Sequence, residues 1–277
     1  MSALSAAPDD PALTRMTVEK WQGNTRKRCE DMVAVETPVA LEYNGISHAV
    51  MLASPEYLDD FALGFSLSEG ILAAPSELFD CDVAIVEQGI RVQMQIAAQR
   101  FMALKEHRRN LTGRTGCGLC GTETLQQAIR QPPPVACTAT FSAAAIHAGI
   151  MAMQTRQHLQ QRSGATHAAA WMRADGAIAL VREDVGRHNA LDKLIGALAH
   201  ARTDFSSGAL LITSRASVEM VQKAATVGIG FMVAISAPTN LAIRLAGQTG
   251  VTLLGFARAH SHVVYTHAHR LLAEEPN

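Results

Sequence analysis

Several features that this 277-residue chain lacks narrow its class before any motif is considered. The formal net charge is −1, so the marked basic excess that is typical of general nucleic-acid binding is missing. No segment approaches the roughly 18 continuous apolar residues of a membrane helix. The first residues carry no basic segment leading into an apolar run, so we expect no secretory signal there. The sequence therefore predicts a cytoplasmic protein that binds neither nucleic acid nor membrane, with a flexible tail over residues 1–20.

Cysteine is also scarce, and its arrangement argues against a disulfide framework. The chain has 5 cysteines, of which only Cys117 and Cys120 are close in sequence. An odd number with one close pair favours a reducing compartment, where the pair serves chemistry or binds metal. Hydrophobic residues make up 48% of the chain and charged residues 18%, which is typical of a globular protein with a sizeable core.

The first half of the chain has the pattern of an α+β domain. The predicted elements are a hairpin over 32–53 that turns at Asn44-Gly45, a helix from Pro55 to about Leu72, and a second hairpin around Gln88-Gly89. Three prolines at 132–134 fit neither a helix interior nor a central strand, so a linker is expected there. We therefore predict a smaller α+β domain over 21–135 and a second domain over 136–277.

The second half has the pattern of a layered α/β domain. The predicted elements are a helix over 142–161, strands over 166–171 and 177–182, a helix over 187–201, strands over 208–214, 231–236 and 251–257, and intervening helices over 217–228 and 239–249. Alternation of strand and helix in the last part is typical of a parallel sheet with right-handed crossovers.

The close cysteine pair lies in Arg114-Thr115-Gly116-Cys117-Gly118-Leu119-Cys120-Gly121. A basic run over 100–114 leads into it, and a short helix is predicted over 122–129. The basic run is either a solvated surface or a set of cations that face the thiols and an anionic ligand. Nearby cations and a helix N-terminus lower a thiol pKa, and a thiolate can take the outer sulfur of a persulfide. We expect an exposed sulfur-carrying loop that is poorly ordered in a crystal.

Other uses of a Cys-x-x-Cys pair fit this sequence less well. Structural zinc needs two more ligands, and His262 and His267 have a suitable spacing but lie far along the chain. A zinc deaminase would have His-x-Glu and a proline before the first cysteine, whereas Gly116 stands there and His-x-Glu is missing. A thioredoxin-like pair would lie near a βαβ unit. Zinc stays open as an alternative, and we expect no metal.

A phosphate-binding crevice is predicted where two strands of the second half end. The strand over 208–214 leads into Thr213–Ser217, and the strand over 231–236 leads into Ser236–Thr239. Both segments open helices, and such strand ends and helix N-termini suit phosphate. Ser214, Ser217 or Thr239 can cap these helices at the same time. The chain has neither a Walker loop nor Gly-x-Gly-x-x-Gly, so an ordinary ATP or NAD site is not expected.

The segment Glu183–Lys193 carries a third group of polar residues. In one interpretation Arg187 and His188 open a helix and face a phosphate or the transferred sulfur. In the other, Arg187 and Lys193 simply pair with Asp184 and Asp192 on the surface. His167 lies inside an otherwise apolar strand, where a histidine is more often a core residue than a catalyst.

Taken together, these segments resemble the FdhD family. The resemblance rests on residues 43–48, 62–70, 114–121, 166–171, 183–193 and 214–223, which read YNGISH, ALGFSLSEG, RTGCGLCG, THAAAW, EDVGRHNALDK and SRASVEMVQK. It extends from about residue 35 to Leu271.

The resemblance implies a sulfurtransferase that accepts sulfur from a cysteine desulfurase as a persulfide on Cys117. Cys120 would be the assisting or resolving thiol. The sulfur would pass to the molybdenum bis(molybdopterin guanine dinucleotide) cofactor before that cofactor enters formate dehydrogenase. The resemblance also implies a homodimer and a cytidine-deaminase-like three-layer α/β domain without the zinc site. A guanine nucleotide such as GDP would mimic the cofactor.

The cofactor-binding segment of the family maps onto Phe256-Ala257-Arg258-Ala259-His260-Ser261. The family pattern is Phe-x-Lys-x-Gly-Arg, so Arg258 keeps the cation, while His260 and Ser261 depart from the pattern. Together with Ser214, Arg187 and His188, this segment is the predicted cofactor site. The alternative function is a non-catalytic chaperone that holds the molybdenum cofactor for formate dehydrogenase.

Overall fold

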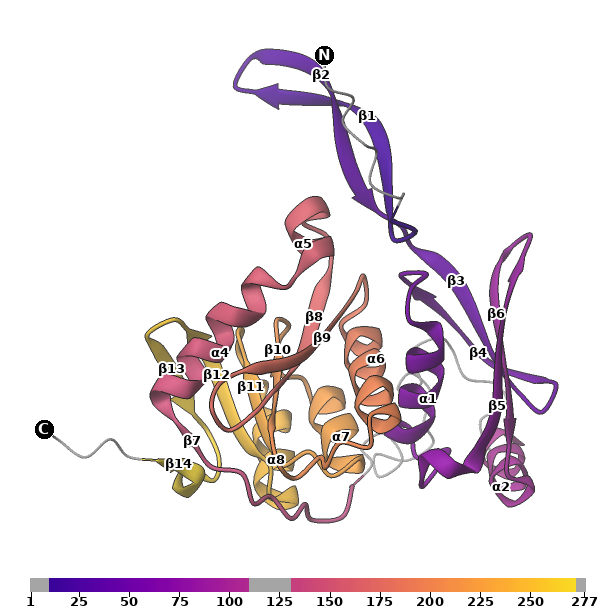
Figure 1. The fold of residues 1–277 in the computed structure, drawn as a ribbon, viewed down its shortest axis with the longest axis vertical. Coiled ribbons are helices and arrows are strands. Elements are labelled where there is room, and N and C mark those ends of the chain that lie inside the picture. The colour runs from indigo at the N-terminus through magenta and orange to yellow at the C-terminus, as the bar shows by residue number, and fades with distance from the viewer. Residues whose placement is uncertain (1–9, 110–130, 273–277) are drawn as a thin grey trace, which may run out of the picture.

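The computed structural model describes residues 10–109 and 131–272 (Figure 1). Its elements are, in order, β1 (Leu13–Gln22), β2 (Thr25–Ala34), β3 (Thr37–Tyr43), β4 (Ile46–Ala53), α1 (Leu58–Ser68), η1 (Pro75–Glu77), β5 (Leu78–Val86), β6 (Gly89–Ile96), α2 (Ala98–Arg109), β7 (Phe141–Ser142), α4 (Ala143–Thr155), α5 (His158–Ser163), β8 (His167–Met172), β9 (Ile178–Asp184), α6 (Arg187–His200), β10 (Ala209–Ile212), α7 (Val218–Thr226), β11 (Phe231–Ala234), α8 (Asn240–Thr249), β12 (Thr252–Arg258), β13 (Ser261–Val264), η2 (Ala268–Arg270) and β14 (Leu271–Leu272). Within these ranges no helix is long and apolar enough to cross a membrane.

Strands β1 and β2 form a two-stranded arm that projects from the rest of the chain (Figure 1). Residues 13–20, which were expected to belong to a flexible tail, make up most of β1. The strands turn at Gly23, whose φ of 57° lies in the left-handed region that favours glycine. Few side chains of the arm are buried, so the strands lack the apolar alternation by which a strand is recognised in a sequence.

A four-stranded sheet with the order β4-β3-β6-β5 follows, and α1 packs against it. Alternate residues of β3, namely Val39, Leu41 and Tyr43, are fully buried. The predicted turn at Asn44-Gly45 is confirmed, with φ values of 47° and 81°. The predicted helix is shorter than expected, since it begins at Leu58 and ends at Ser68.

A six-stranded mixed sheet with the order β13-β12-β11-β10-β8-β9 organises the second half. Strands β10, β11 and β12 are parallel and are connected by α7 and α8, which confirms the predicted alternation. Strand β8 pairs with β10, β9 with β8 and β13 with β12, each in antiparallel orientation. Adjacent residues of β10 enter different cores: Leu210 and Ile212 pack with α6 and α7, and Ala209 and Leu211 pack with α4. The sheet is therefore covered on both faces.

The single helix predicted over 142–161 is wrong, because the chain forms two helices, α4 and α5, with a break at Arg156 and Gln157. The Arg156 guanidinium donates to the carbonyl of Ile178, and the Glu183 carboxylate accepts from the N–H groups of Leu159 and Gln160 at 2.9 and 2.8 Å. These contacts with β9 fix a new helix start that helical periodicity does not reveal.

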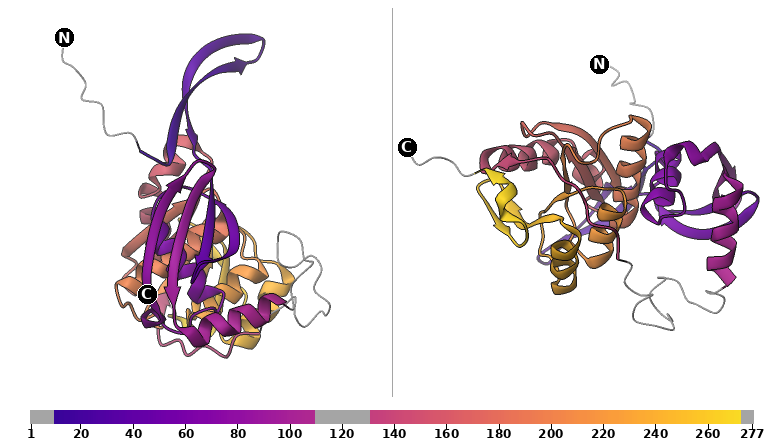
Figure 2. Two further views of the ribbon diagram at one scale, coloured as in Figure 1. Left: turned by 90° about the vertical axis from the view of Figure 1, so that its right-hand side faces the viewer. Right: turned by 90° about the horizontal axis from the view of Figure 1, so that it is seen from below.

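The two halves share one hydrophobic core, because α1 packs against α6 at their junction (Figure 2). Glycines make this close approach feasible. A Cβ atom at Gly64 of α1 would lie 1.7 Å from the carbonyl oxygen of Asp192, and one at Gly196 of α6 would lie 1.9 Å from that of Asp60. The helix backbones therefore touch where side chains would otherwise separate them.

Candidate functional site

The ends of four strands meet at one edge of the six-stranded sheet. His167 opens β8 opposite Asp184 at the end of β9. The segments that follow β10 and β11 lie beside each other through a parallel bridge between Ala216 and Pro238. The N–H of Thr239 donates to the carbonyl of Ala216 at 3.0 Å, which holds the two segments together. The loops predicted to form an anion-binding crevice are therefore neighbours.

Arg187 and His188 open α6 at this edge, as predicted. Burial, then the nearby cations Arg187 and Lys223, lower the pKa of His188 to about 4. Burial and Arg187 also lower the pKa of His167. The Nε2 atom of His188 is buried and has no hydrogen-bond partner among the described residues. A neutral imidazole with an unpaired ring nitrogen is suited to bind a polar ligand group.

The serine and threonine hydroxyls at this edge have different roles. The Thr239 hydroxyl caps α8 by accepting from the N–H of Ala242 at 3.3 Å, which confirms one of the predicted caps. Ser217 is the N-cap residue of α7, but its side chain makes no capping bond. Ser214 is buried, and its hydroxyl donates to the carbonyl of Arg215 at 3.1 Å. Arg215 itself is exposed, so the segment that follows β10 presents a cation to solvent.

The segment Phe256–Ser261 lies next to the end of β11. The N–H of Phe256 donates to the carbonyl of Ser236 at 3.2 Å, and the guanidinium of Arg258 donates to the carbonyl of Ile235. Phe256 has a φ of 51° and is 48% exposed, whereas Ala257 is fully buried in the core. The remaining members of the segment are Ala259, which is half-buried, and His260 and Ser261, which are exposed. The structure therefore brings this segment to the edge that carries Ser214 and Arg187.

Asp184 and Lys193 form a fully buried ion pair with an N···O distance of 2.7 Å, so the interpretation as a surface pair is wrong. Asp184 also accepts from the N–H of Gly186 at 2.8 Å and from the Asn189 side chain at 3.0 Å. The backbone of Ser54 completes the contact: its N–H donates to Asp184 and its carbonyl accepts from Lys193. Asp184 thus holds the turn that places Arg187 and His188.

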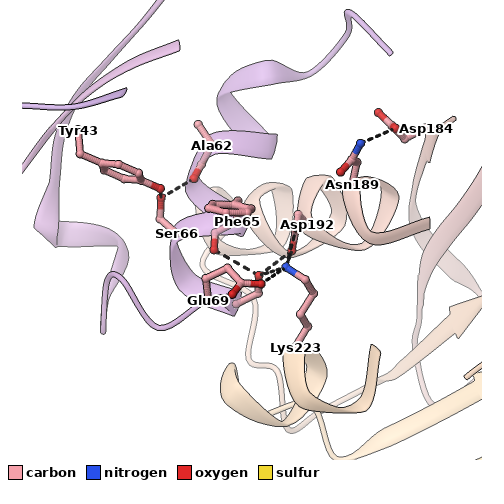
Figure 3. Close-up of polar contacts among 10 residues, drawn as sticks. Tyr43, Ala62, Phe65, Ser66, Glu69, Asp184, Asn189, Asp192 and Lys223 are labelled. Carbon is pink, nitrogen blue, oxygen red and sulfur yellow. Dashed lines mark hydrogen bonds and ion pairs between the residues drawn. The ribbon is translucent and has the colours of Figure 1, made fainter. Parts of the chain in front are cut away.

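A second buried network, which sequence reasoning did not find, surrounds the ammonium of Lys223 (Figure 3). The Lys223 ammonium lies 2.9 Å from both carboxylate oxygens of Asp192, 2.7 Å from Glu69 and 3.0 Å from the Ser68 hydroxyl. Burial alone would lower the pKa of Lys223, but the carboxylates of Asp192 and Glu69 outweigh it and raise the pKa. The network joins α1, α6 and α7. The sequence shows Glu69, Asp192 and Lys223 far apart along the chain, but it does not show that they pair.

Cys117 and Cys120 lie outside the described residues, as do Arg114 and the helix predicted over 122–129. In the described part of the basic run, Arg100 pairs with Glu77 at 2.9 Å, and the Lys105 ammonium lies 4.4 Å from the centroid of the Phe101 ring. At least these two cations therefore have structural contacts.

The described part of the chain contains three free cysteines, Cys29, Cys81 and Cys137. Burial and nearby aspartates raise the pKa of Cys81 to about 11, which disfavours its thiolate. A reactive role is therefore not indicated for Cys81.

A groove of about 900 Å³ lies away from this edge, at the C-terminal ends of α1, α6 and α7. Its described lining includes Leu67, His200, Phe205 and Val227, and none of the residues that line it was predicted as a site residue. The candidate site is therefore defined by converging polar groups rather than by the volume of a cavity.

The fold and the site define a mixed α/β protein with polar groups gathered at the strand ends of its larger sheet. The sequence profile of the FdhD/NarQ family matches residues 34–272. The chain belongs to the FdhD/NarQ family, which confirms the resemblance.

Individual relatives agree along nearly the whole chain. The sulfur carrier protein FdhD of Cupriavidus necator is 57% identical over 272 residues, covering 98% of this chain and 94% of that protein. The sulfur carrier protein FdhD of Xanthomonas campestris is 49% identical over 271 residues, covering 98% of this chain and 96% of that protein. A crystal structure from Desulfotalea psychrophila, provisionally assigned as a formate dehydrogenase accessory protein, has a TM-score of 0.74 and 22% identity and covers 95% of this chain and 100% of that one. The last comparison supports the fold alone.

Proposed function

We propose that this protein is a sulfur carrier that acts as a sulfurtransferase for formate dehydrogenase. The observation that carries the proposal is the position of Gly116-Cys117-Gly118 and Cys120-Gly121 within a chain that matches sulfur carrier proteins over nearly its full length. Glycines beside a thiol allow a donor protein to approach closely. In this proposal the protein acts in the cytoplasm as a homodimer and contacts both a cysteine desulfurase and the dehydrogenase.

The proposed reaction has two steps. The Cys117 thiolate attacks the outer sulfur of the persulfide on the desulfurase, so that an S–S bond forms on Cys117 and the desulfurase thiolate leaves. When an acceptor is bound, the Cys120 thiolate attacks the inner sulfur of the Cys117 persulfide, which releases the outer sulfur to the acceptor as hydrosulfide and leaves a Cys117–Cys120 disulfide. The two thiols supply the two electrons, and an external thiol reductant restores them.

The anionic molybdenum bis(molybdopterin guanine dinucleotide) cofactor is the proposed acceptor and client. Arg187, His188, Ser214 and the segment Phe256–Ser261 would hold it. The fit is supported by the unpaired buried Nε2 of His188 and by the exposed Arg215 in the segment that follows β10. GDP would occupy the same groups as a mimic of the guanine dinucleotide.

We further propose that the second half is a cytidine-deaminase-like three-layer domain that has lost the zinc site. The strand order β9-β8-β10-β11-β12, with an antiparallel hairpin leading into three parallel strands, supports this assignment. The missing His-x-Glu in the sequence supports the loss of deaminase chemistry.

The proposal is tested by intact-mass measurement after incubation with a cysteine desulfurase and cysteine. We expect the wild-type protein to gain one sulfur atom, and the Cys117→Ala variant to gain none. Undiminished loading of that variant would contradict the carrier role at Cys117. If Cys117→Ala also restored active formate dehydrogenase in a strain that lacks the native protein, the chaperone alternative would hold instead.

A further inference from the structure

Two histidines from distant parts of the chain face each other outside the site described above. His147 lies on α4 and His262 lies on β13, the edge strand of the six-stranded sheet. The Nε2 atom of His147 is 3.1 Å from the Nδ1 atom of His262. The ring centroids are 5.2 Å apart and the ring planes are inclined at 58°.

Both side chains project from elements that packing holds in place. Ile146 and Ile150 of α4 are buried in the core on one face of the sheet, together with Leu254 of β12. Val264 packs against the same core and lies opposite Leu254 in the β12–β13 register. Because alternate residues of a strand face the same side, His262 shares the side of Val264 and is directed toward α4.

The separation of the two nitrogens matches the coordination of one metal ion. Zinc–imidazole bonds are about 2.0–2.1 Å long, so two nitrogens on one tetrahedral zinc ion lie about 3.3 Å apart. Octahedral ions with similar bonds place adjacent nitrogens about 3 Å apart. The observed 3.1 Å lies between these values, so the two nitrogens are spaced as ligands of one ion are.

Neutral imidazole is the form of histidine that binds metal. Within residues 10–109 and 131–272 no group of three or more His, Cys, Asp or Glu side chains could hold a metal, so water would fill the other positions.

We propose that His147 and His262 form a two-histidine site for a divalent transition-metal cation such as Zn²⁺ or Ni²⁺. The ion would replace the single shared proton of the imidazole pair and bridge α4 to the edge strand β13. Since β13 begins at Ser261, the last residue of the segment Phe256–Ser261, the bound ion would also fix the strand that continues this segment. The inference does not depend on the sulfur-carrier proposal.

The test uses the full chain carrying Cys117→Ser and Cys120→Ser, which removes the two thiols that would compete for metal. Binding of Zn²⁺ and of Ni²⁺ is measured by equilibrium dialysis, and thermal unfolding is followed with and without each ion. We expect one bound equivalent and a higher Tm, because an ion that binds only the folded chain stabilises it.

His262→Gln and His147→Phe in the same background should each lose this equivalent and the rise in Tm. The phenylalanine keeps a ring in the contact but supplies no ligand, so it separates coordination from packing. His269→Gln, which changes an exposed histidine that contacts His267, is the matched control and should keep both effects. The site is refuted if the background protein shows no saturable binding, or if His262→Gln binds as much metal as the His269→Gln control.

Discussion

At the scale of single residues, the segment Glu183–Lys193 acts through buried contacts rather than through surface charges. Asp184 is fully buried, accepts hydrogen bonds from Ser54, Gly186 and Asn189, and pairs with Lys193. Burial lowers the pKa of Lys193, and Asp184 counteracts that effect. The residues that present Arg187 and His188 are thus as important to the candidate site as the residues that would touch a ligand.

Replacing Asp184 with alanine should destabilise the protein strongly, because it leaves the Lys193 ammonium buried without its counter-ion. Breaking one side of a buried ion pair costs about 3–5 kcal/mol. Urea unfolding measures this as a fall in the free energy of unfolding. The control is Glu19→Ala, since Glu19 and Arg26 form an exposed pair at 3.5 Å that should contribute less than about 1 kcal/mol. Equal effects of the two variants would show that burial of the pair does not matter.

His188 should make stability depend on pH. Its folded-state pKa of about 4 lies below the ordinary value of about 6.5, so the unfolded chain takes up a proton first as the pH falls. The stability from neutral His188 is therefore complete above about pH 6.5 and is lost toward pH 4, amounting to at most about 2 kcal/mol between pH 7 and pH 5.

Urea unfolding at pH 7 and pH 5 would measure this dependence. The His188→Gln variant should lose less stability between these two pH values than the wild type does. His269→Gln, at an exposed position, should lose as much as the wild type. If His188→Gln and the wild type lose the same amount, the buried neutral state of His188 is wrong.

At the scale of elements, the arm of β1 and β2 is anchored at its base. Ala12 and Leu13 form a small core with Leu159 of α5, and Met32 packs against it. The distal part carries the exposed Trp21, which is 62% exposed, with the Arg26 guanidinium 5.9 Å from its ring centroid. An isolated two-stranded hairpin is only marginally stable in water, so the arm depends on this base.

Truncating Leu13 to alanine should therefore loosen the arm, whereas truncating Trp21 should not. Leu13 is buried, and loss of a buried leucine costs about 2 kcal/mol or more, while an exposed cation–π contact contributes about 0.5–1 kcal/mol. Amide hydrogen exchange should accelerate over residues 13–34 in Leu13→Ala and remain unchanged in β10, β11 and β12. Faster exchange of the arm in Trp21→Ala than in Leu13→Ala would contradict an anchor at the base.

At the scale of the whole molecule, the two halves behave as one packing unit. Side chains of β3, α1, α6 and α7 belong to the same core, and the Lys223 network crosses the same junction. The domain boundary predicted beside residues 132–134 divides the sequence, but one hydrophobic core contains residues from both sides of it. This junction also holds the candidate site in place, because α6 both packs on α1 and presents Arg187 and His188.

The close approach of α1 and α6 predicts opposite effects for two glycine-to-alanine changes in helices. Gly64→Ala should cost about 3 kcal/mol or more, because its Cβ would lie 1.7 Å from the Asp192 carbonyl oxygen. Gly247→Ala in α8 should be neutral or stabilise by up to about 1 kcal/mol, because its Cβ would meet only the Thr266 methyl group at 3.9 Å. Thermal or urea unfolding of both variants measures the difference. A Gly64→Ala protein as stable as Gly247→Ala would refute the backbone contact.

The sequence by itself determined the features that depend on neighbouring residues. The turn at Asn44-Gly45, the capping of α8 by Thr239 and the parallel order of β10, β11 and β12 follow local rules, and all are present. The family motifs likewise gave the family and the role proposed for Cys117 without any coordinates.

Only the tertiary structure decided which distant residues meet. The break between α4 and α5 depends on Glu183, the partner of Lys223 is Asp192, and His262 faces His147 from 115 residues away. Such contacts are selected by the packing of whole elements, since many charged or aromatic side chains are equally suitable partners by local pattern. The physical reason is that burial makes unpaired polar groups costly, so the fold pairs those groups that its packing brings together.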